Sequence, residues 1–204
     1  MAFACSMNFD KDKLKSEVQL TYTRVAEDPG GYYHFHCGAQ YAATHLGYDL
    51  AALQALPLAA TEVFCGLGNP FRIGVLESGA TVIDVGSGGG MDCLLAAKQV
   101  GPNGSVIGID MTDAMLQRSS GAARAAGLVN VRFEKADMIR LPFADDSVDV
   151  AISNGVINLA TDKEAVFADL FRVVKPGGRL QIADMIIKGD LSEEARNDID
   201  LWTG

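Results

Sequence analysis

The residues best suited to chemistry form a glycine-rich turn between two short apolar runs. Residues 82–92 read Val-Ile-Asp-Val-Gly-Ser-Gly-Gly-Gly-Met-Asp, and Asp110 ends the second apolar run. Gly86, Gly88 and Gly90 let the main chain approach a ligand closely because they lack a Cβ. A helix that starts here directs free N–H groups at the ligand, and an acid after the next strand can accept both hydroxyls of a ribose. The pattern predicts a site for an adenosine-containing cofactor.

The spacing of the glycines narrows the kind of cofactor. The dinucleotide fingerprint G-x-G-x-x-G needs its third glycine where this chain has Met91 or Cys93, which argues against nicotinamide and flavin binding. Asp84 stands two residues before the first glycine, and a carboxylate there suits a cationic ligand better than a pyrophosphate. This acid-x-Gly-x-Gly-x-Gly pattern resembles the first motif of class I S-adenosylmethionine-dependent methyltransferases. The resemblance implies S-adenosylmethionine as cofactor and S-adenosylhomocysteine as its product.

Strands and helices that alternate along the chain must hold this turn in place. Between about residues 79 and 188, apolar runs alternate with helix-like segments, which is typical of a parallel sheet covered by helices on both faces. We therefore predict an α/β, Rossmann-like three-layer sandwich with a mostly parallel sheet of about five strands. The expected strands are 81–85, 105–109, 129–134, 148–153 and 179–184.

Local signals predict where the helices begin and end. A helix over 91–100 follows the glycine turn, and Thr112 is expected to cap the next one. The segment Thr161-Asp-Lys-Glu164 reads as a capping box for a third helix, which Pro-Gly-Gly at 176–178 ends. Ser192 is expected to cap a last helix.

The chain is predicted to divide into a cover and a core within one domain. Residues 1–78 form a helical and loop lid, in which 49–60 reads as a short helix interrupted at Pro57. Residues 79–204 form the S-adenosylmethionine-binding core.

Two histidines in the predicted lid are candidate catalytic bases. His34 and His36 alternate onto one face of an extended, aromatic stretch. Together with Cys37 they offer three metal ligands, and no further ligand is spaced to complete a site, so no metal is predicted. An aromatic lid over the cofactor is the favoured interpretation of the stretch.

Composition excludes several classes of function. The chain has 204 residues, 49% hydrophobic residues and a net charge of −9. That acidity argues against DNA or RNA as partner, because phosphates are repelled. No apolar run approaches the roughly 20 residues of a membrane helix, and charged residues from position 10 precede any apolar signal core. The four cysteines form no Cys-x-x-Cys pair, which is typical of a reduced, cytoplasmic protein.

Further motifs over about residues 48–203 resemble one branch of the family, the arsenite methyltransferases. The most specific are Ile-Asp-Met-Thr at 109–112 and Ser-Asn-x-Val-Ile-Asn-Leu at 153–159. Tyr-Asp at 48–49, Ala-Leu-Pro at 55–57, Gly-Asn-Pro at 68–70, Asp-Lys-Glu-Ala-Val-Phe at 162–167 and Lys-Pro-Gly-Gly at 175–178 accompany them.

The resemblance implies a role for each candidate residue. Asp110 holds the ribose, Met111 lies on the adenine, Asp137 accepts from the adenine amino group with Met138 beside it, and Asn154 lies near the methionine end. The amino-acid part of the cofactor is surrounded by the loop residues Asp84, Gly86, Ser87, Gly88 and Gly90. Two plainer interpretations stay open: Asp137 as a solvated turn acid, and both methionines as ordinary core residues.

The chain departs from that branch at the cysteines that bind As(III) in it. Thiolates are soft donors suited to As(III). Two of the family's cysteine positions hold Leu67 and Gly155 here, and a third falls just beyond Gly204. We therefore expect no arsenic binding. The C-terminal antiparallel hairpin of the family is also expected to be absent, as in a truncated form, which leaves a sheet edge open to homodimer formation.

These observations favour a methyltransferase that acts on a small molecule. Three alternatives remain: arsenite methylation despite the lost thiols, carbon methylation of a quinone-like ring, and S-adenosylmethionine binding without catalysis. The acceptor itself is not readable from the residues.

Overall fold

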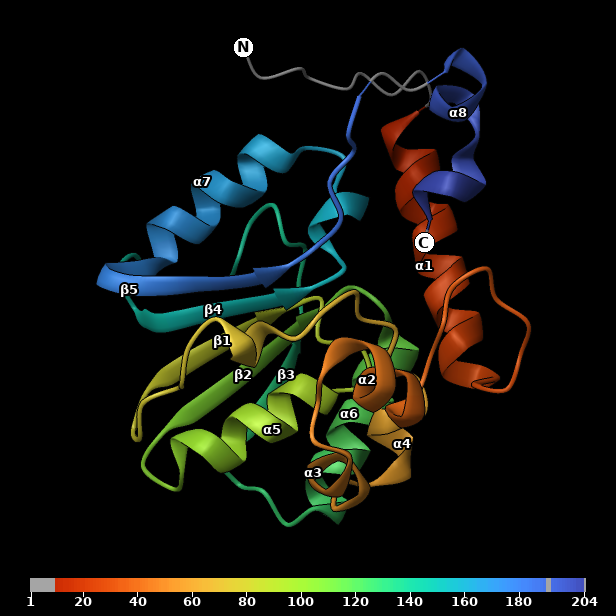
Figure 1. Ribbon diagram of the computed structural model, residues 1–204. Coiled ribbons are helices and arrows are strands. Elements are labelled where there is room, and N and C mark those ends of the chain that lie inside the picture. The colour runs from red at the N-terminus through yellow and green to blue at the C-terminus, as the bar shows by residue number, and fades with distance from the viewer. Residues whose placement is uncertain (1–9, 190–191, 204) are drawn as a thin grey trace.

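The computed structural model describes residues 10–189 and 192–203, and its centre is a parallel sheet. Five strands lie in the order β3-β2-β1-β4-β5, and every pair is parallel. The α/β Rossmann-like prediction is confirmed (Figure 1). The strands are β1 Thr81–Val85, β2 Ser105–Asp110, β3 Val131–Lys135, β4 Val148–Asn154 and β5 Val174–Ala183.

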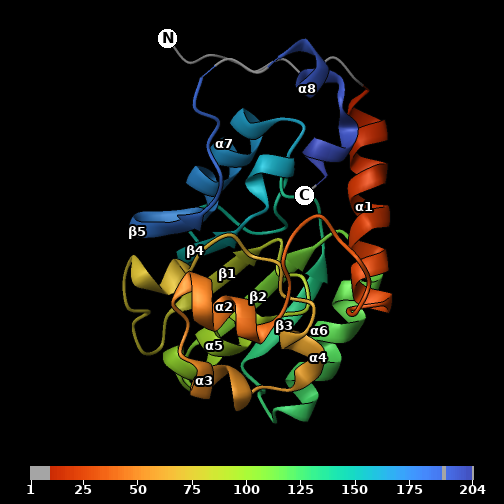
Figure 2. The ribbon, with the colours of Figure 1, turned by 45° about the vertical axis from the view of Figure 1, so that its right-hand side comes forward.

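Alternation along the strands creates two apolar faces and hence three layers. Ile83 and Val85 face one cluster with Val166 and Leu170, whereas Val82 faces the opposite cluster. Helix α7 (Lys163–Val173) covers the first face, and α5 (Met91–Val100) and α6 (Asp113–Ala125) cover the other (Figures 1 and 2).

The strand order determines where a ligand can bind. β1 pairs with β2 on one side and with β4 on the other. The connection after β1 leads to β2 on one side, and the connection after β4 leads to β5 on the other side. The loops at the carboxyl ends of β1 and β4 therefore separate and leave a crevice between them. The glycine turn follows β1 and lies at this crevice.

The segment before the sheet is mostly helical, and its first helix reaches the crevice. Asp10 caps α1 by accepting from the backbone N–H groups of Asp12 and Lys13. Helix α1 stands across the carboxyl ends of the strands (Figure 1), where Leu14 and Val18 are buried against Leu159. The helices are α1 Lys11–Glu27, α2 Ala39–Leu46, α3 Leu50–Gln54 and α4 Leu58–Thr61, followed by a 3₁₀ turn at Pro70–Arg72. The predicted interruption at Pro57 separates α3 from α4.

Two predicted helix caps are wrong. Thr112 occupies the N-cap position of α6, but its side chain makes no capping hydrogen bond. It is buried and hydrogen-bonded to Asp110 instead. Asp162, rather than Thr161, caps α7 by accepting from the backbone N–H of Ala165, because a carboxylate accepts more strongly than a hydroxyl.

The boundaries of the outer strands also differ from prediction. β3 begins two residues later than expected, at Val131. β5 starts at Val174, directly after α7, and Pro176-Gly177-Gly178 lies inside it, where the register against β4 shifts. Pro and Gly are tolerated there because β5 is an edge strand. Ser192 caps α8 (Glu193–Asn197) as expected, and a 3₁₀ turn (Ile199–Trp202) packs on α1.

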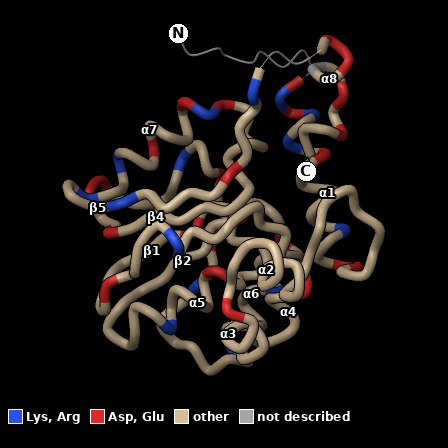
Figure 3. Tube along the Cα trace, viewed as in Figure 1, with Lys and Arg blue, Asp and Glu red and all other residues tan. Residues whose placement is uncertain are grey.

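The outer edge of β5 is open in the part of the chain that the structure describes. No described strand pairs with that edge, and Leu180 on β5 is 39% exposed. Figure 3 shows Lys and Arg interspersed with Asp and Glu over the molecule. None of the described helices is both long and apolar enough to cross a membrane.

Candidate cofactor-binding site

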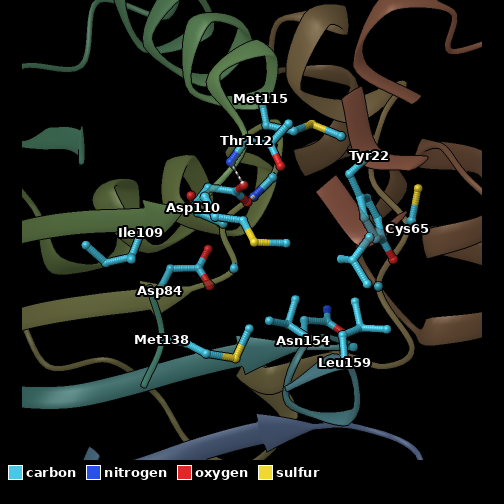
Figure 4. A pocket seen from close by; sticks show the side chains of 18 of the residues that line it. Tyr22, Cys65, Asp84, Ile109, Asp110, Thr112, Met115, Met138, Asn154 and Leu159 are labelled. Atoms are coloured by element: carbon cyan, nitrogen blue, oxygen red, sulfur yellow. Dashed lines mark hydrogen bonds between the residues drawn. The ribbon is translucent and has the colours of Figure 1, made fainter. Parts of the chain in front are cut away.

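A cavity opens at the carboxyl ends of β1, β2 and β4, under α1 (Figure 4). It encloses about 1150 Å³ of empty space, including its open mouth. Every predicted cofactor residue except Gly90 lines it: Asp84, Gly86, Ser87, Gly88, Asp110, Met111, Asp137, Met138 and Asn154. These residues, which lie far apart in the sequence, therefore share one cavity.

The three glycines of the turn have different surroundings, so a side chain is not excluded at all three for the same reason. Each has a positive φ (76° at Gly86, 50° at Gly88, 89° at Gly90). A Cβ on Gly86 would lie 2.4 Å from Val156, and one on Gly90 would lie 2.9 Å from Phe133. A Cβ on Gly88 would have no atom within 4 Å. Gly86 and Gly90 are therefore packing requirements, whereas Gly88 leaves space free beside the cavity, as a cradle for a ligand requires.

Asp110 is oriented by the turn that it faces. Its Oδ2 accepts from the Gly88 N–H at 2.8 Å, and its Oδ1 accepts from the Thr112 N–H at 2.8 Å. Burial raises the pKa of Asp110, and these N–H groups oppose the shift by favouring the carboxylate. Each oxygen retains a lone pair for a ribose hydroxyl.

Asp137 lies at the mouth of the cavity and is tied to α1. Its Oδ1 accepts from the Ile139 N–H at 3.1 Å, and its Oδ2 pairs with Lys15 Nζ. Met138 packs against the main core and Met111 against α1, while both also line the cavity. Core packing and cofactor contact are therefore compatible for both methionines.

Asn154 is fully engaged with the protein. Its Oδ1 accepts from the N–H groups of Leu67 and Gly68 at 2.9 and 3.0 Å. Its Nδ2 contacts Gly68 O, Tyr48 Oη and Asp92 Oδ2 at 2.8, 3.0 and 3.1 Å. The amide therefore shapes the cavity wall by fixing the 66–68 loop to the end of β4.

Sequence reasoning missed two groups on the lining. Lys15, Val18 and Tyr22 reach the cavity from α1, and Asp92 reaches it from the first turn of α5. The apolar residues at 14, 18, 22 and 25 recur at nearly helical spacing, which was a usable signal that α1 buries one face. Asp92 stands two residues after Gly90 and carried no signal beyond being an acid in a first helical turn.

The structure does not bring His34 or His36 to the cavity lining. The His34 ring meets Phe35 edge-on at 5.0 Å, and the His36 ring lies 5.1 Å from Tyr41. Phe35 in turn stacks on Tyr22 at 5.9 Å. The aromatic stretch therefore braces α1 rather than lining the cavity. Among the described residues, no group of three or more His, Cys, Asp or Glu could hold a metal ion.

The strand order, the glycine cradle and the acid at the end of β2 define a class I, S-adenosylmethionine-dependent methyltransferase domain. A model of the methyltransferase domain family matches residues 76–203. The chain belongs to this methyltransferase family.

Similar proteins point to one branch. The chain is 42% identical over 159 residues to an arsenite methyltransferase of Halobacterium salinarum, covering 78% of this chain and 40% of the relative. It is 40% identical to one of Aquipseudomonas alcaligenes, covering 66% and 40%. The chain thus spans two fifths of the length of these curated relatives.

A solved structure extends the likeness to three dimensions. An arsenic (III) S-adenosylmethionine methyltransferase from Chlamydomonas reinhardtii matches with a TM-score of 0.66 and 37% identity, covering 71% of this chain and 51% of that chain. A methyltransferase from Aquifex aeolicus, at 23% identity and a TM-score of 0.54, supports the fold alone.

Proposed function

We propose that this domain transfers the methyl group of S-adenosylmethionine to a small-molecule acceptor and releases S-adenosylhomocysteine. The observation that carries the proposal is the cavity at the strand ends, where Gly88 leaves room for a ligand beside the carboxylate of Asp110. The bound cofactor supplies an electrophilic methyl group on a sulfonium. The protein must hold the acceptor in line with it and exclude water.

The proposed contacts follow the chemistry of the lining. Asp110 binds the ribose hydroxyls, and Asp137 accepts from the adenine amino group between Met111 and Met138. The loop residues surround the amino-acid part, with Asn154 shaping the wall beside it. Helix α1 and the segment at 60–66 cover the cofactor, so that Val18 and Leu159 keep the reacting end apolar.

The contact between residues 67 and 155 favours an acceptor other than As(III). These positions correspond to cysteines in the arsenite methyltransferases that the sequence resembles. A Cβ on Gly155 would lie 2.9 Å from Leu67 Cγ, so the two positions adjoin beside the cavity. Here one position holds the hydrocarbon side chain of Leu67 and the other holds a glycine, whereas a soft ion needs thiolates. An uncharged organic acceptor suits this wall better.

Arsenite methylation remains the second candidate because two other thiols lie near the cavity. Cys65 lines it, and a hydrogen bond with Cys65 lowers the pKa of the neighbouring Cys37. The relatives named arsenite methyltransferases make As(III) the natural second acceptor to assay.

A labelled-methyl acceptor screen tests both candidates. Purified protein is incubated with labelled S-adenosylmethionine and a panel of phenols, quinols, thiols, amines and As(III). Transfer to an organic acceptor supports the main proposal, and transfer to quinols alone selects carbon methylation of a ring. As(III) transfer by the wild type overturns it in favour of the second candidate. Binding without any turnover favours a non-catalytic binding protein.

A double variant serves as the matched control for arsenic. Leu67→Cys/Gly155→Cys replaces the apolar contact by two adjacent thiols, and the loss of the two Leu67 methyl groups opens part of the space that the second side chain needs. Because Gly155 has a φ of 70°, where an L side chain strains the backbone, circular dichroism first checks that the variant folds. The variant is expected to bind As(III) more tightly than the wild type in a fluorescence or calorimetric titration. Equal affinity would show that these positions do not adjoin as described.

We also propose how the protein associates and where it works. The open edge of β5 would pair with a second copy, giving a homodimer. Analytical ultracentrifugation at increasing protein concentration tests the proposed dimer. A protein that stays monomeric at every concentration would count against it. The net charge of −9 and the dispersed basic residues support a protein that binds no nucleic acid. The free thiols of Cys37, Cys65 and Cys93 support a reducing, cytoplasmic setting.

A further inference from the structure

Three side chains from distant parts of the chain meet where β1, β4 and α5 adjoin the cavity. The Tyr48 hydroxyl donates to Asp92 Oδ1 at 2.8 Å. Asn154 Nδ2 donates to Asp92 Oδ2 at 3.1 Å and to Tyr48 Oη at 3.0 Å. The triangle is closed, and each carboxylate oxygen of Asp92 has its own donor.

The triangle is buried yet open to the cavity on one side. Tyr48, Asp92 and Asn154 are 6%, 5% and 9% exposed, and the last two line the cavity. Burying a carboxylate is unfavourable unless hydrogen bonds compensate for the lost water. Both donors are uncharged, so they stabilise the ionised form without neutralising it. Among the described residues, no salt bridge supplies Asp92 with a cationic partner.

Asp84 and Asp92 form a buried pair of acids, and the groups around them leave Asp92 as the one that is ionised near neutral pH. Burial raises the pKa of Asp92 to about 6, while the hydrogen bonds from Asn154 and Tyr48 lower it. Asp84 on β1 faces Asp92. The pKa of Asp84 lies well above its usual range, mainly because the side chain is buried and also because Asp92 carries a like charge. Cys93 donates to Asp84 at 3.2 Å, and Asp110 on β2 adds a like charge.

We propose that Asp92 is the carboxylate that receives the positive methionine end of S-adenosylmethionine, and that Tyr48 and Asn154 are positioning residues that keep Asp92 ionised and turned towards the cavity. The inference rests on the proposed function, since it places that cofactor in this cavity. The acid before the glycine turn, Asp84, then has a supporting role as the protonated neighbour.

The pH dependence of cofactor binding follows from this arrangement. A cation binds the ionised form of Asp92, whose pKa is about 6. Affinity for the cofactor is therefore full above that pH and falls by about tenfold per unit below it. Loss of the Tyr48 hydroxyl removes a donor to the charged form, so the midpoint should move upward by about one pH unit.

Calorimetric titrations from about pH 5 to about pH 8 test the proposal. The proteins are the wild type, Asp92→Asn, Tyr48→Phe and the control Tyr41→Phe, which alters a phenol away from the cavity lining. The ligands are S-adenosylmethionine and 5′-methylthioadenosine, which lacks the charged methionine end. We expect Asp92→Asn to lose at least about tenfold in affinity for the first ligand, with a flat pH profile, and little for the second.

Several outcomes would overturn the proposal. Asp92→Asn could retain the affinity and pH profile of the wild type, or lose both ligands equally, which would indicate a merely structural acid. Tyr48→Phe could weaken binding at every pH without moving the midpoint. If Asp92→Asn fails to fold, Tyr48→Phe decides, because its ring keeps its packing 5.5 Å from Phe64. A wild type that binds no S-adenosylmethionine at any pH would instead overturn the proposed function.

Discussion

At the scale of single residues, the cavity is a ring of acids around a glycine turn. Asp84, Asp92, Asp110 and Asp137 all line it, and Lys15 is the basic residue of the lining. A cleft lined mainly by one sign of charge concentrates ligands of the opposite sign. The residues therefore suit a cationic sulfonium cofactor better than a phosphate-rich dinucleotide.

Replacement of Asp110 tests the ribose assignment. Asp110→Ala removes the acceptor for two ribose hydroxyls and leaves the Gly88 and Thr112 N–H groups unpaired. Two hydrogen bonds to a charged acceptor contribute about 1.5–3 kcal/mol each, so affinity for S-adenosylhomocysteine should fall by about 100-fold or more. Calorimetric titration measures it. Asp113→Ala, at an exposed acid paired with Lys135, is the control, and an Asp110 variant that binds equally well removes the assignment.

Replacement of Cys65 separates cofactor binding from arsenic chemistry. The thiol donates to Val63 O at 3.3 Å, and a serine hydroxyl can make the same hydrogen bond. Cys65→Ser should therefore leave the affinity for S-adenosylmethionine unchanged in a titration, while any As(III)-dependent turnover should disappear. Loss of cofactor affinity would mean that Cys65 contacts the cofactor directly.

At the scale of elements, the strands of the core were predicted more closely than the helices that precede them. The strands 81–85 and 105–109 were predicted almost to the residue, because continuous apolar runs bounded by glycines allow few other structures. Helix α1 was predicted only as part of a helical and loop lid over residues 1–78, without bounds of its own. Its position over the cavity depends on Leu14, Val18 and Leu159, contacts between segments far apart in sequence.

The cap of α7 offers a direct test at this scale. Asp162 Oδ1 accepts from the Ala165 N–H at 3.0 Å, whereas Thr161 makes no capping bond to this helix. Asp162→Ala should lower the free energy of unfolding by about 1 kcal/mol. Thr161→Ala is the matched control and should change it far less. Urea denaturation followed by circular dichroism distinguishes the two variants. A larger loss of stability in Thr161→Ala would support the capping box that the sequence predicted.

At the scale of the whole molecule, strand order creates the site. β1 lies between β2 and β4, so the glycine turn, Asp110 and Asn154 arrive at one end of the sheet from separate parts of the chain. The same order leaves β5 at the edge. The stability of the fold therefore depends on the ionisation of these acids, because folding brings them together before any cation is bound.

This linkage predicts how S-adenosylmethionine should change thermal stability with pH. The raised pKa of Asp92 means that its protonation stabilises the free protein at low pH, and this stabilisation is lost as the pH rises through about 6. The pKa of Asp84 is raised well above its usual range, so its contribution is lost at higher pH. A cation offsets the loss. At 100 times its Kd the cofactor should add about 2.7 kcal/mol. At one fixed cofactor concentration, the gain in Tm should be larger at about pH 7.5 than at about pH 5. Equal gains would contradict the linkage.

The sequence by itself determined the class of protein, because the motif that defines the class lies within one short stretch of the chain. A glycine turn after an apolar strand, with acids before it and after the next strand, specifies the cradle and the carboxylate proposed to bind the ribose within some thirty residues. Only the tertiary structure decided what surrounds the cradle. Tyr48, Asp92 and Asn154 lie up to 106 positions apart, and α1 reaches the cavity from the start of the chain. Buried charges and hydrogen bonds between distant segments have no local pattern, since they arise only when packing excludes water from both partners at once.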